Sequence, residues 1–217
     1  MLNENIEDYL KAIYGISTIE FVSTNDIAEK LGYSPSNVSK MLKRLAELEF
    51  VEYISHRGVK LTESGVRESI KILRRHRLLE MFLFKALGYK WDEIHKEACV
   101  LEHHISVKFE NAIDEFLGYP TRDPHGDPIP DKNGNMMTYN VVPLSEVEIG
   151  KSVRIIRILG NNADFLKYLA DLNLLPDTSL KLLKKEPFAG SIIIESNKAE
   201  KILGLDAAKL ILVEIEN

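Results

Sequence analysis

The sequence predicts a mainly helical protein with small β parts, beginning with a winged helix-turn-helix. Three observations support this fold class. Apolar residues recur at helical spacing through most of residues 4–117, and short alternating segments interrupt them at residues 51–61. After Pro143 the apolar segments shorten and read as strands. Between these parts, the Pro- and Asp-rich residues 119–140 are typical of an extended connector.

Caps and apolar stripes define the N-terminal helices. Residues 4–16 repeat apolar side chains at helical spacing. Residues 24–32 begin with a capping threonine and end with a helix-stopping glycine, and Ser34 caps a third helix with Pro35 in its first turn. Two short helices joined by a glycine-containing turn are the helix-turn-helix pattern. The alternating segments on either side of residues 55–58 then predict a small hairpin, the wing.

Two long helices and a β-rich part follow the wing. The first helix opens at Thr62 and runs to about Leu87, and residues 91–117 keep the spacing of a second. Beyond the connector we expect strands at residues 153–156, 179–183, 192–194 and 211–215, with short helices at residues 165–172 and 198–202. The chain is therefore divided into domains at residues 1–73, 74–140 and 141–217.

Charge and cysteine content limit the possible functions. The net charge of −5 argues against nucleic-acid binding through bulk charge. However, residues 30–77 hold eleven basic and five acidic residues, whereas residues 92–118 hold seven acidic and two basic residues. This asymmetry suggests one anion-binding and one cation-binding segment. A single cysteine, no membrane-length apolar run and no signal-peptide pattern predict a cytoplasmic protein.

Potential metal ligands gather in residues 95–104. On a helix, Cys99, Glu102 and His103 share one face, and a second pair at helical spacing, His76 and Glu80, lies upstream. A thiolate, a carboxylate and an imidazole suit a first-row divalent metal better than calcium or magnesium. The paired ligands of a structural zinc site are missing. Spacing alone leaves open a solvated helix face on which Cys99 is a small core residue.

The order of these motifs resembles the diphtheria toxin repressor family of metal-dependent regulators. The motifs are the winged helix, R-H-R-L-L-E at residues 75–80, H-x-x-x-C-x-x-E-H at residues 95–103, the Pro-rich connector and the β-rich domain. The N-terminal E-D-Y-L of residues 7–10 is also similar to the family's first-helix motif. The resemblance implies a repressor that senses Mn(II) or Fe(II) and controls metal-uptake genes. It also implies a homodimer formed through residues 91–117 and an SH3-like C-terminal domain.

Carried over residue by residue, the resemblance implies two metal sites. The primary site would use Asp8, Cys99, Glu102 and His103. The ancillary site would use His76, Glu80 and His95, completed by Asp123 and His125 from the connector and by Asn161 or Asp164 from the third domain. Asp123 stands where long members of the family carry a cysteine. Lys11 stands where the two-domain manganese sensors carry a glutamate, so we do not expect their paired-metal site.

The winged helix predicts how the protein would meet DNA. The N-terminal residues of a recognition helix lie at base edges in the major groove, and the wing can reach the backbone or minor groove. The candidate DNA contacts are Ser34, Ser36, Asn37, Ser39, Lys40, Lys43, Arg44, His56 and Arg57. A two-fold symmetric dimer predicts double-stranded palindromic operator DNA. The alternative is a winged helix that mediates protein contacts.

Two other functions compete with this interpretation. Cys99 could make the protein a redox-sensing DNA-binding regulator whose DNA binding is lost on oxidation. Glu97 or Glu102 could act as the base of a metal-dependent hydrolase. The sequence has no G-x-S-x-G, phosphate-loop or H-E-x-x-H motif, which favours a regulator over an enzyme.

Overall fold

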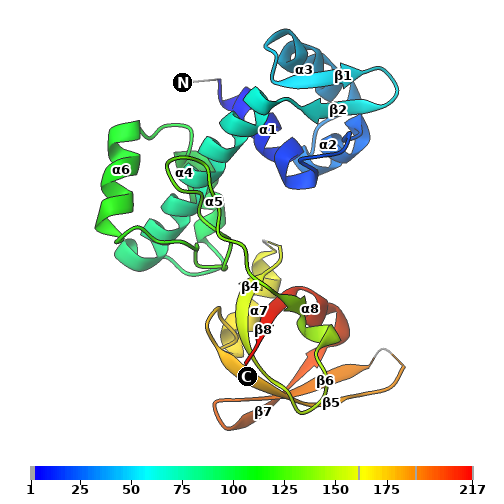
Figure 1. The fold of residues 1–217 in the computed structure, drawn as a ribbon, viewed down its shortest axis with the longest axis vertical. Coiled ribbons are helices and arrows are strands. Elements are labelled where there is room, and N and C mark those ends of the chain that lie inside the picture. The colour runs from blue at the N-terminus through cyan, green and yellow to red at the C-terminus, as the bar shows by residue number, and fades with distance from the viewer. Residues whose placement is uncertain (1–2, 161, 189, 217) are drawn as a thin grey trace. The chain divides into compact units, whose positions relative to one another are not determined.

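A computed structural model describes residues 3–160, 162–188 and 190–216 (Figure 1). Two compact units are present. The first comprises residues up to 76 together with 101–105 and 130–135, and the second comprises residues 77–100, 106–129 and 136 onward. The boundary falls within one continuous helix, α4 (Glu63–Leu87). Each unit is described below by itself.

The first unit contains the predicted winged helix-turn-helix. Its elements are α1 (Glu4–Ile16), α2 (Thr24–Leu31), α3 (Pro35–Glu47), the hairpin strands β1 (Val51–Ile54) and β2 (Gly58–Leu61), and the first half of α4. The side chains of Asn3, Ser23 and Ser34 cap the three N-terminal helices by accepting backbone N–H bonds. Leu10, Ile27 and Leu42 are fully buried, so one apolar core holds the three helices together.

The second predicted long helix is in fact two helices, so that prediction is wrong. Figure 1 shows α5 (Ile94–Leu101) and α6 (Val107–Phe116) as separate segments. The chain turns after Leu101, and Ser106 caps α6 by accepting a hydrogen bond of 3.2 Å from the backbone N–H of Phe109. Apolar spacing continued across residues 102–106, but the cap at Ser106 starts a new helix.

The C-terminal part of the second unit is one antiparallel sheet with short helices. Its elements are β3 (Val142–Pro143), the 3₁₀ turn η1 (Leu144–Glu146), β4 (Ser152–Ile158), α7 (Ala163–Asp171), β5 (Ser179–Lys185), β6 (Ser191–Ser196), β7 (Ala199–Gly204), α8 (Leu205–Lys209) and β8 (Ile211–Ile215). The strand order is β3-β8-β4-β5-β6-β7. The four predicted strands and the first predicted helix are confirmed. The expected helix at residues 198–202 is wrong, because that segment pairs with β6 as β7.

The connector is held against the sheet by its own backbone. Its described residues contain an isolated bridge between Arg122 and Pro128 but no helix or longer strand. The backbone N–H of Ile158 donates to the carbonyl of His125 at 2.8 Å. Gly126 has a φ of 89°, and a Cβ there would lie 1.9 Å from the carbonyl oxygen of Ile156. Only glycine therefore lets this loop approach β4 so closely.

None of the helices in the described part of the chain combines the length and the apolar character that a membrane crossing requires.

Candidate metal centres

Three potential metal ligands meet in the first unit, and we call them the first site: Asp8, Glu102 and His103. One ligand atom of each lies within 4.8 Å of the others. Asp8 is on α1, whereas Glu102 and His103 are in the turn that follows α5. His103 Nε2 is 3.2 Å from Asp8 Oδ1 and 3.5 Å from Glu102 Oε1. Glu102 and His103 are buried and Asp8 is half-buried.

Buried side chains around the first site fix the orientation of its imidazole. His103 Nδ1 lies 2.7 Å from Glu7 Oε2, so Nε2 is the nitrogen that faces Asp8 and Glu102. Arg75 donates to Glu7 Oε1 at 2.8 Å and to the backbone carbonyl of Glu102 at 2.9 Å. Metal-binding histidines usually have their second nitrogen held in this way.

The two carboxyl groups of the first site differ in their surroundings. Burial raises the pKa of Glu102, but the hydrogen bond and charge of His76, together with Lys11, outweigh it and lower the net pKa. His76 Nδ1 is 2.6 Å from Glu102 Oε2, and Lys11 Nζ forms an ion pair with Oε1. Burial also raises the pKa of Asp8, and there His103 and Lys11 oppose it only in part. Glu102 is therefore held as an anion in the interior.

A second group of ligands, which we call the second site, lies in the second unit: Glu80, Asp123 and His125. All three are buried, and one ligand atom of each lies within 4.8 Å of the others. Glu80 is on α4, and the other two come from the connector. His125 Nε2 is 3.2 Å from the carbonyl oxygen of Trp91, while Nδ1 is 3.9 Å from Glu80 Oε2. The backbone carbonyl thus turns Nδ1 toward the carboxylates.

Trp91 forms one wall of the second site. Its ring lies 5.1 Å from that of His125, centroid to centroid, and its indole N–H donates to the carbonyl of Pro124 at 3.0 Å. Trp91 begins the segment of residues 91–117 that the resemblance assigns to the dimer contact, but its own side chain is buried within the unit.

The second site brings buried carboxyl groups together in the interior. Burial raises the pKa of Asp123 well above its ordinary value, and the neighbouring charges of Glu80 and Asp127 raise it further, against the opposing charge of Arg77. Asp123 Oδ1 accepts from the backbone N–H groups of His125 and Asp127 at 2.8 and 2.9 Å. A divalent cation would relieve the repulsion between these carboxylates. The donors and their charge therefore fit a metal.

Asp127 fixes the loop of the second site from both sides. Its Oδ1 lies 3.3 Å from an Arg77 guanidinium nitrogen on α4 and also forms an ion pair with Arg157 on β4. Arg77 Nε is in addition 3.8 Å from Asp123 Oδ2. The sequence analysis assigned no role to Arg77, Asp127 or Glu7. Glu7 and Arg77 lie within the quoted motifs, but spacing does not show that a residue acts by holding a ligand.

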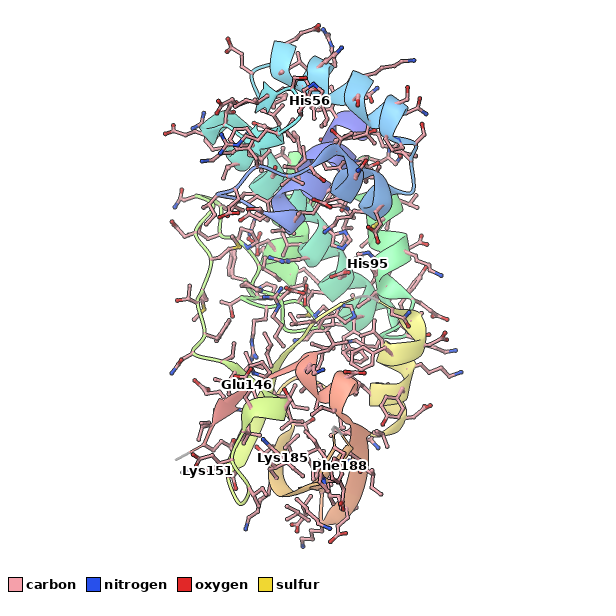
Figure 2. The ribbon with its side chains drawn as sticks, turned by 90° about the vertical axis from the view of Figure 1, so that its right-hand side faces the viewer. His56, His95, Glu146, Lys151, Lys185 and Phe188 are labelled. Carbon is pink, nitrogen blue, oxygen red and sulfur yellow. The ribbon has the colours of Figure 1, made fainter. Side chains whose placement is uncertain are left out.

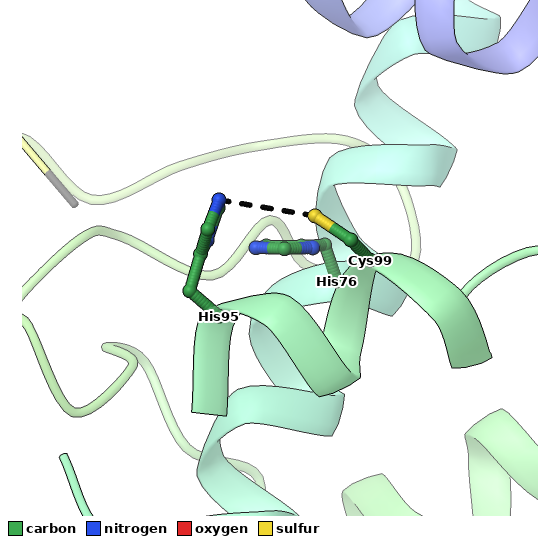
Figure 3. Close-up of side chains that lie close together, drawn as sticks. All are labelled: His76, His95 and Cys99. Carbon is green, nitrogen blue, oxygen red and sulfur yellow. Dashed lines mark hydrogen bonds between the residues drawn. The ribbon is translucent and has the colours of Figure 1, made fainter. Parts of the chain in front are cut away.

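Cys99 belongs to neither of the two sites. Figure 3 shows its thiol with His95, one turn earlier on α5, and Sγ is 3.8 Å from Nε2. His95 Nδ1 is 3.0 Å from Glu80 Oε1, so His95 lies at the edge of the second site. Because α5 ends at Leu101, helical spacing no longer aligns Cys99 with Glu102. The structure thus groups Asp8, Glu102 and His103 without the predicted thiolate.

The remaining predicted ligands lie elsewhere. His76, one turn before Glu80 on α4, contacts Glu102 within the first unit. Asp164 is exposed in the first turn of α7 and joins no group of potential ligands among the described residues. Asn161 lies outside the described residues.

The predicted DNA contacts are placed on α3 and the wing. Exposed residues among them are Ser34, Ser36, Asn37, Lys40, Lys43, Arg44, His56 and Arg57, and Ser39 is half-buried. Figure 2 marks His56 in the turn between β1 and β2. Ser34 Oγ accepts from Asn37 N–H, and Ser39 Oγ donates to the carbonyl of Pro35 at 2.9 Å. These two hydroxyls therefore serve the helix itself.

Three family models match consecutive segments of the chain. Residues 1–59 match "Iron dependent repressor, N-terminal DNA binding domain", residues 62–131 match "Iron dependent repressor, metal binding and dimerisation domain", and residues 142–215 match "FeoA domain". The chain is 27% identical to the iron-dependent repressor IdeR of Mycobacterium tuberculosis over 98% of each chain. It is 33% identical to the regulator MntR of Bacillus subtilis, over 57% of this chain and 87% of that protein.

Solved structures give the same result. One described as "Manganese-dependent transcriptional repressor complex with manganese" is 39% identical, covers 97% of this chain and 100% of its own, and superposes with a TM-score of 0.88.

Proposed function

We propose a metal-controlled switch for this protein, which belongs to the iron-dependent repressor family. Membership makes it a metal-dependent DNA-binding transcriptional repressor and not an enzyme. Two metal sites would control its operator binding. The first would use Asp8, Glu102 and His103, and the second Glu80, Asp123 and His125. The buried, mutually repelling carboxylates of the second site are the single observation that carries this proposal most strongly.

The donor sets favour Mn(II) as the activating metal, with Fe(II) as its nearest competitor. Each site offers two carboxylates and one imidazole. Carboxylates suit manganese, imidazole also suits iron, and a thiolate would have favoured softer metals. Cys99 groups with His95 and not with either pair of carboxylates. A relative of 39% identity is described as a complex with manganese. When bound, the ion would supply positive charge that lets the carboxylates of each site stay together ionised.

At the first site, a metal ion would link the DNA-binding helices to the segment that follows α5. Asp8 belongs to α1, which packs in the same core as α2 and α3. Glu102 and His103 belong to the segment between α5 and α6. Holding all three around one centre would restrict α1, and with it the recognition helix. A coupling of this kind typically changes ligand affinity by about 5- to 150-fold.

At the second site, the ligands would steady the connector against its neighbours. Asp123 and His125 lie in the loop whose Gly126 touches β4 and whose Asp127 is paired with arginines on α4 and β4. A metal ion held jointly by Asp123, His125 and Glu80 would therefore fix the loop between the helical part and the sheet of the same unit.

The partners follow from the matched domains. The DNA-binding and dimerisation domains imply operator DNA and a homodimer. We further propose that the operator is palindromic, that it controls metal-uptake genes, and that the protein works in the cytoplasm. The domain limits 1–73, 74–140 and 141–217 remain our proposal, as do the DNA contacts of α3 and the wing.

The test is operator binding measured by fluorescence anisotropy with Mn(II), Fe(II) or a chelator. We expect Mn(II) to tighten binding, and D8N and D123N each to reduce that effect. Cys99→Ser is the matched control, since it changes a potential ligand outside both sites. It should leave the Mn(II) response intact. Operator binding that is equally tight in chelator would overturn the metal switch, and loss of the response in C99S would favour a role for the thiol.

A further inference from the structure

Lys11 lies one turn after Asp8 on α1 and points into the first site. Its ammonium pairs with Glu102 Oε1, and the side chains are 22% and 0% exposed, respectively. Few charged groups of globular proteins are buried this completely without a counter-charge. The pair therefore places a positive charge of the protein itself where two ligand carboxylates meet.

The ion pair involves the oxygen atom that a metal at the first site would need. Glu102 has two carboxylate oxygens, and Oε2 is already bound by His76 at 2.6 Å. Oε1 is the oxygen of Glu102 that lies 3.5 Å from His103 Nε2. Lys11 thus contacts the one oxygen of Glu102 that faces the other two ligands.

Lys11 also offsets part of the negative charge around the site. Arg75 is paired with Glu7, at 2.8 Å, which leaves Asp8 and Glu102 as the two negative charges of the ligand group. Lys11 supplies one compensating positive charge, and a divalent cation would supply two. Two cations beside the same oxygen repel each other in a partly buried environment.

We propose that Lys11 is a tethered cation that competes with the activating metal for Glu102 and thereby lowers the metal affinity of the first site. This inference rests on the proposed function of that site. The same contact links α1 to residues 101–105 in the absence of metal. Removing Lys11 must then have two opposite effects: weaker cohesion of the metal-free protein and tighter binding of metal. A lysine with a purely structural role would lose cohesion without a gain in affinity.

The experiment compares variants in the D123N background, which weakens the second site so that Mn(II) titration by calorimetry reports mainly on the first. We expect K11M and K11Q to bind Mn(II) roughly tenfold more tightly, equivalent to about 1.4 kcal/mol. Both should melt at a lower temperature than the parent without metal. K11R keeps the charge and should match the parent in both measurements. K71M is the control, because Lys71 forms an exposed ion pair with Glu68 on α4.

The outcomes separate this inference from the function it rests on. Unchanged or weaker Mn(II) affinity in folded K11M and K11Q would overturn the role of Lys11 while leaving the first site in place. If neither the parent nor the Lys11 variants lose Mn(II) affinity when H103A is added, the first site itself is wrong, and the inference is overturned with it.

Discussion

At the scale of single residues, both proposed sites depend on how one imidazole is held. Glu7 contacts Nδ1 of His103, whereas the backbone carbonyl of Trp91 contacts Nε2 of His125. Opposite ring nitrogens therefore face the two ligand groups. The sequence could predict which residue types are ligands from their spacing and order. It could not predict which nitrogen is presented, because the holding group comes from a distant segment in each case.

The raised pKa of Asp123 predicts how pH affects the metal-free protein. Its folded-state pKa lies above the ordinary value of 3.8, so ionising this carboxyl costs folding free energy. Stability from this group is therefore fully present below pH 3.8 and is lost as pH rises toward the folded-state pKa. D123N removes the penalty and should raise the melting temperature of the metal-free protein at neutral pH, by about 2–4 °C per kcal/mol relieved. Thermal melts over a pH series measure this.

The matched control is D131N in the same connector. Asp131 is fully exposed, and side-chain and backbone hydrogen bonds from Asn135 lower its pKa, so the sign of its pH effect is reversed. D131N should keep the rise in melting temperature that Mn(II) causes, whereas D123N should lose most of it. A metal-free D123N protein less stable than the parent at neutral pH would contradict the assigned electrostatic cost.

At the scale of elements, the two wrong predictions have identifiable causes. Residues 199–203 are good helix formers, yet Asn197 and Lys198 adopt positive φ values of 54° and 61°, which suit a tight hairpin turn. Pairing with the whole of β6 then overrides local propensity. At the other break, the Ser106 cap was visible in the sequence, but the uninterrupted apolar spacing favoured one helix. Strands and helices with sharp caps on both sides were predictable from local signals alone.

The close contact of Gly126 with β4 predicts an effect on metal binding without any change of ligand. In G126A the new Cβ would lie 1.9 Å from the Ile156 carbonyl oxygen, so the loop must move away from the strand. Asp123 and His125 would move with it. We expect at least about a tenfold loss of Mn(II) affinity at the second site, comparable to the loss of a group that orients a ligand. Calorimetry with D8N present isolates that site.

Gly134→Ala is the control for G126A. Gly134 has a similar φ of 87°, but its added Cβ would meet only the flexible side chain of Ile70, with Cγ2 at 3.4 Å and Cδ1 at 3.9 Å. Both variants therefore strain the backbone, but only G126A places its new Cβ against another backbone segment. Equal losses of Mn(II) affinity in both variants would show that strain, and not displacement of the loop, is responsible.

At the scale of the whole molecule, function depends on assembly as well as on ligands. Two apolar side chains at the ends of α6, Val107 and Phe116, are 72% and 69% exposed. The ring of Phe116 packs edge-on against Phe82 at 6.0 Å between centroids. Because these exposed apolar residues lie on a domain matched as a dimerisation domain, we propose that they form the subunit contact. The order of the domains was predictable because each carries its own motifs along the chain.

Introducing a charge at this contact should produce a monomer. We expect V107E to dissociate the dimer at micromolar concentration in sedimentation velocity. It should also weaken operator binding, because a monomer would contact only half of the palindromic operator that we propose. Affinity for Mn(II) should be unchanged, since Val107 lies outside both ligand groups. I19E is the matched variant, because Ile19 is 74% exposed between α1 and α2. A dimeric V107E protein, or a monomeric I19E protein, would place the contact elsewhere.

The wall that Trp91 forms beside His125 has an optical consequence. The chain contains a single tryptophan, so all of its indole emission originates next to the second site. Paramagnetic Mn(II) held by His125 should quench that emission, and the first site should contribute little. A fluorescence titration without any added label would then follow one of the two sites selectively, with D8N retaining the signal and D123N losing it.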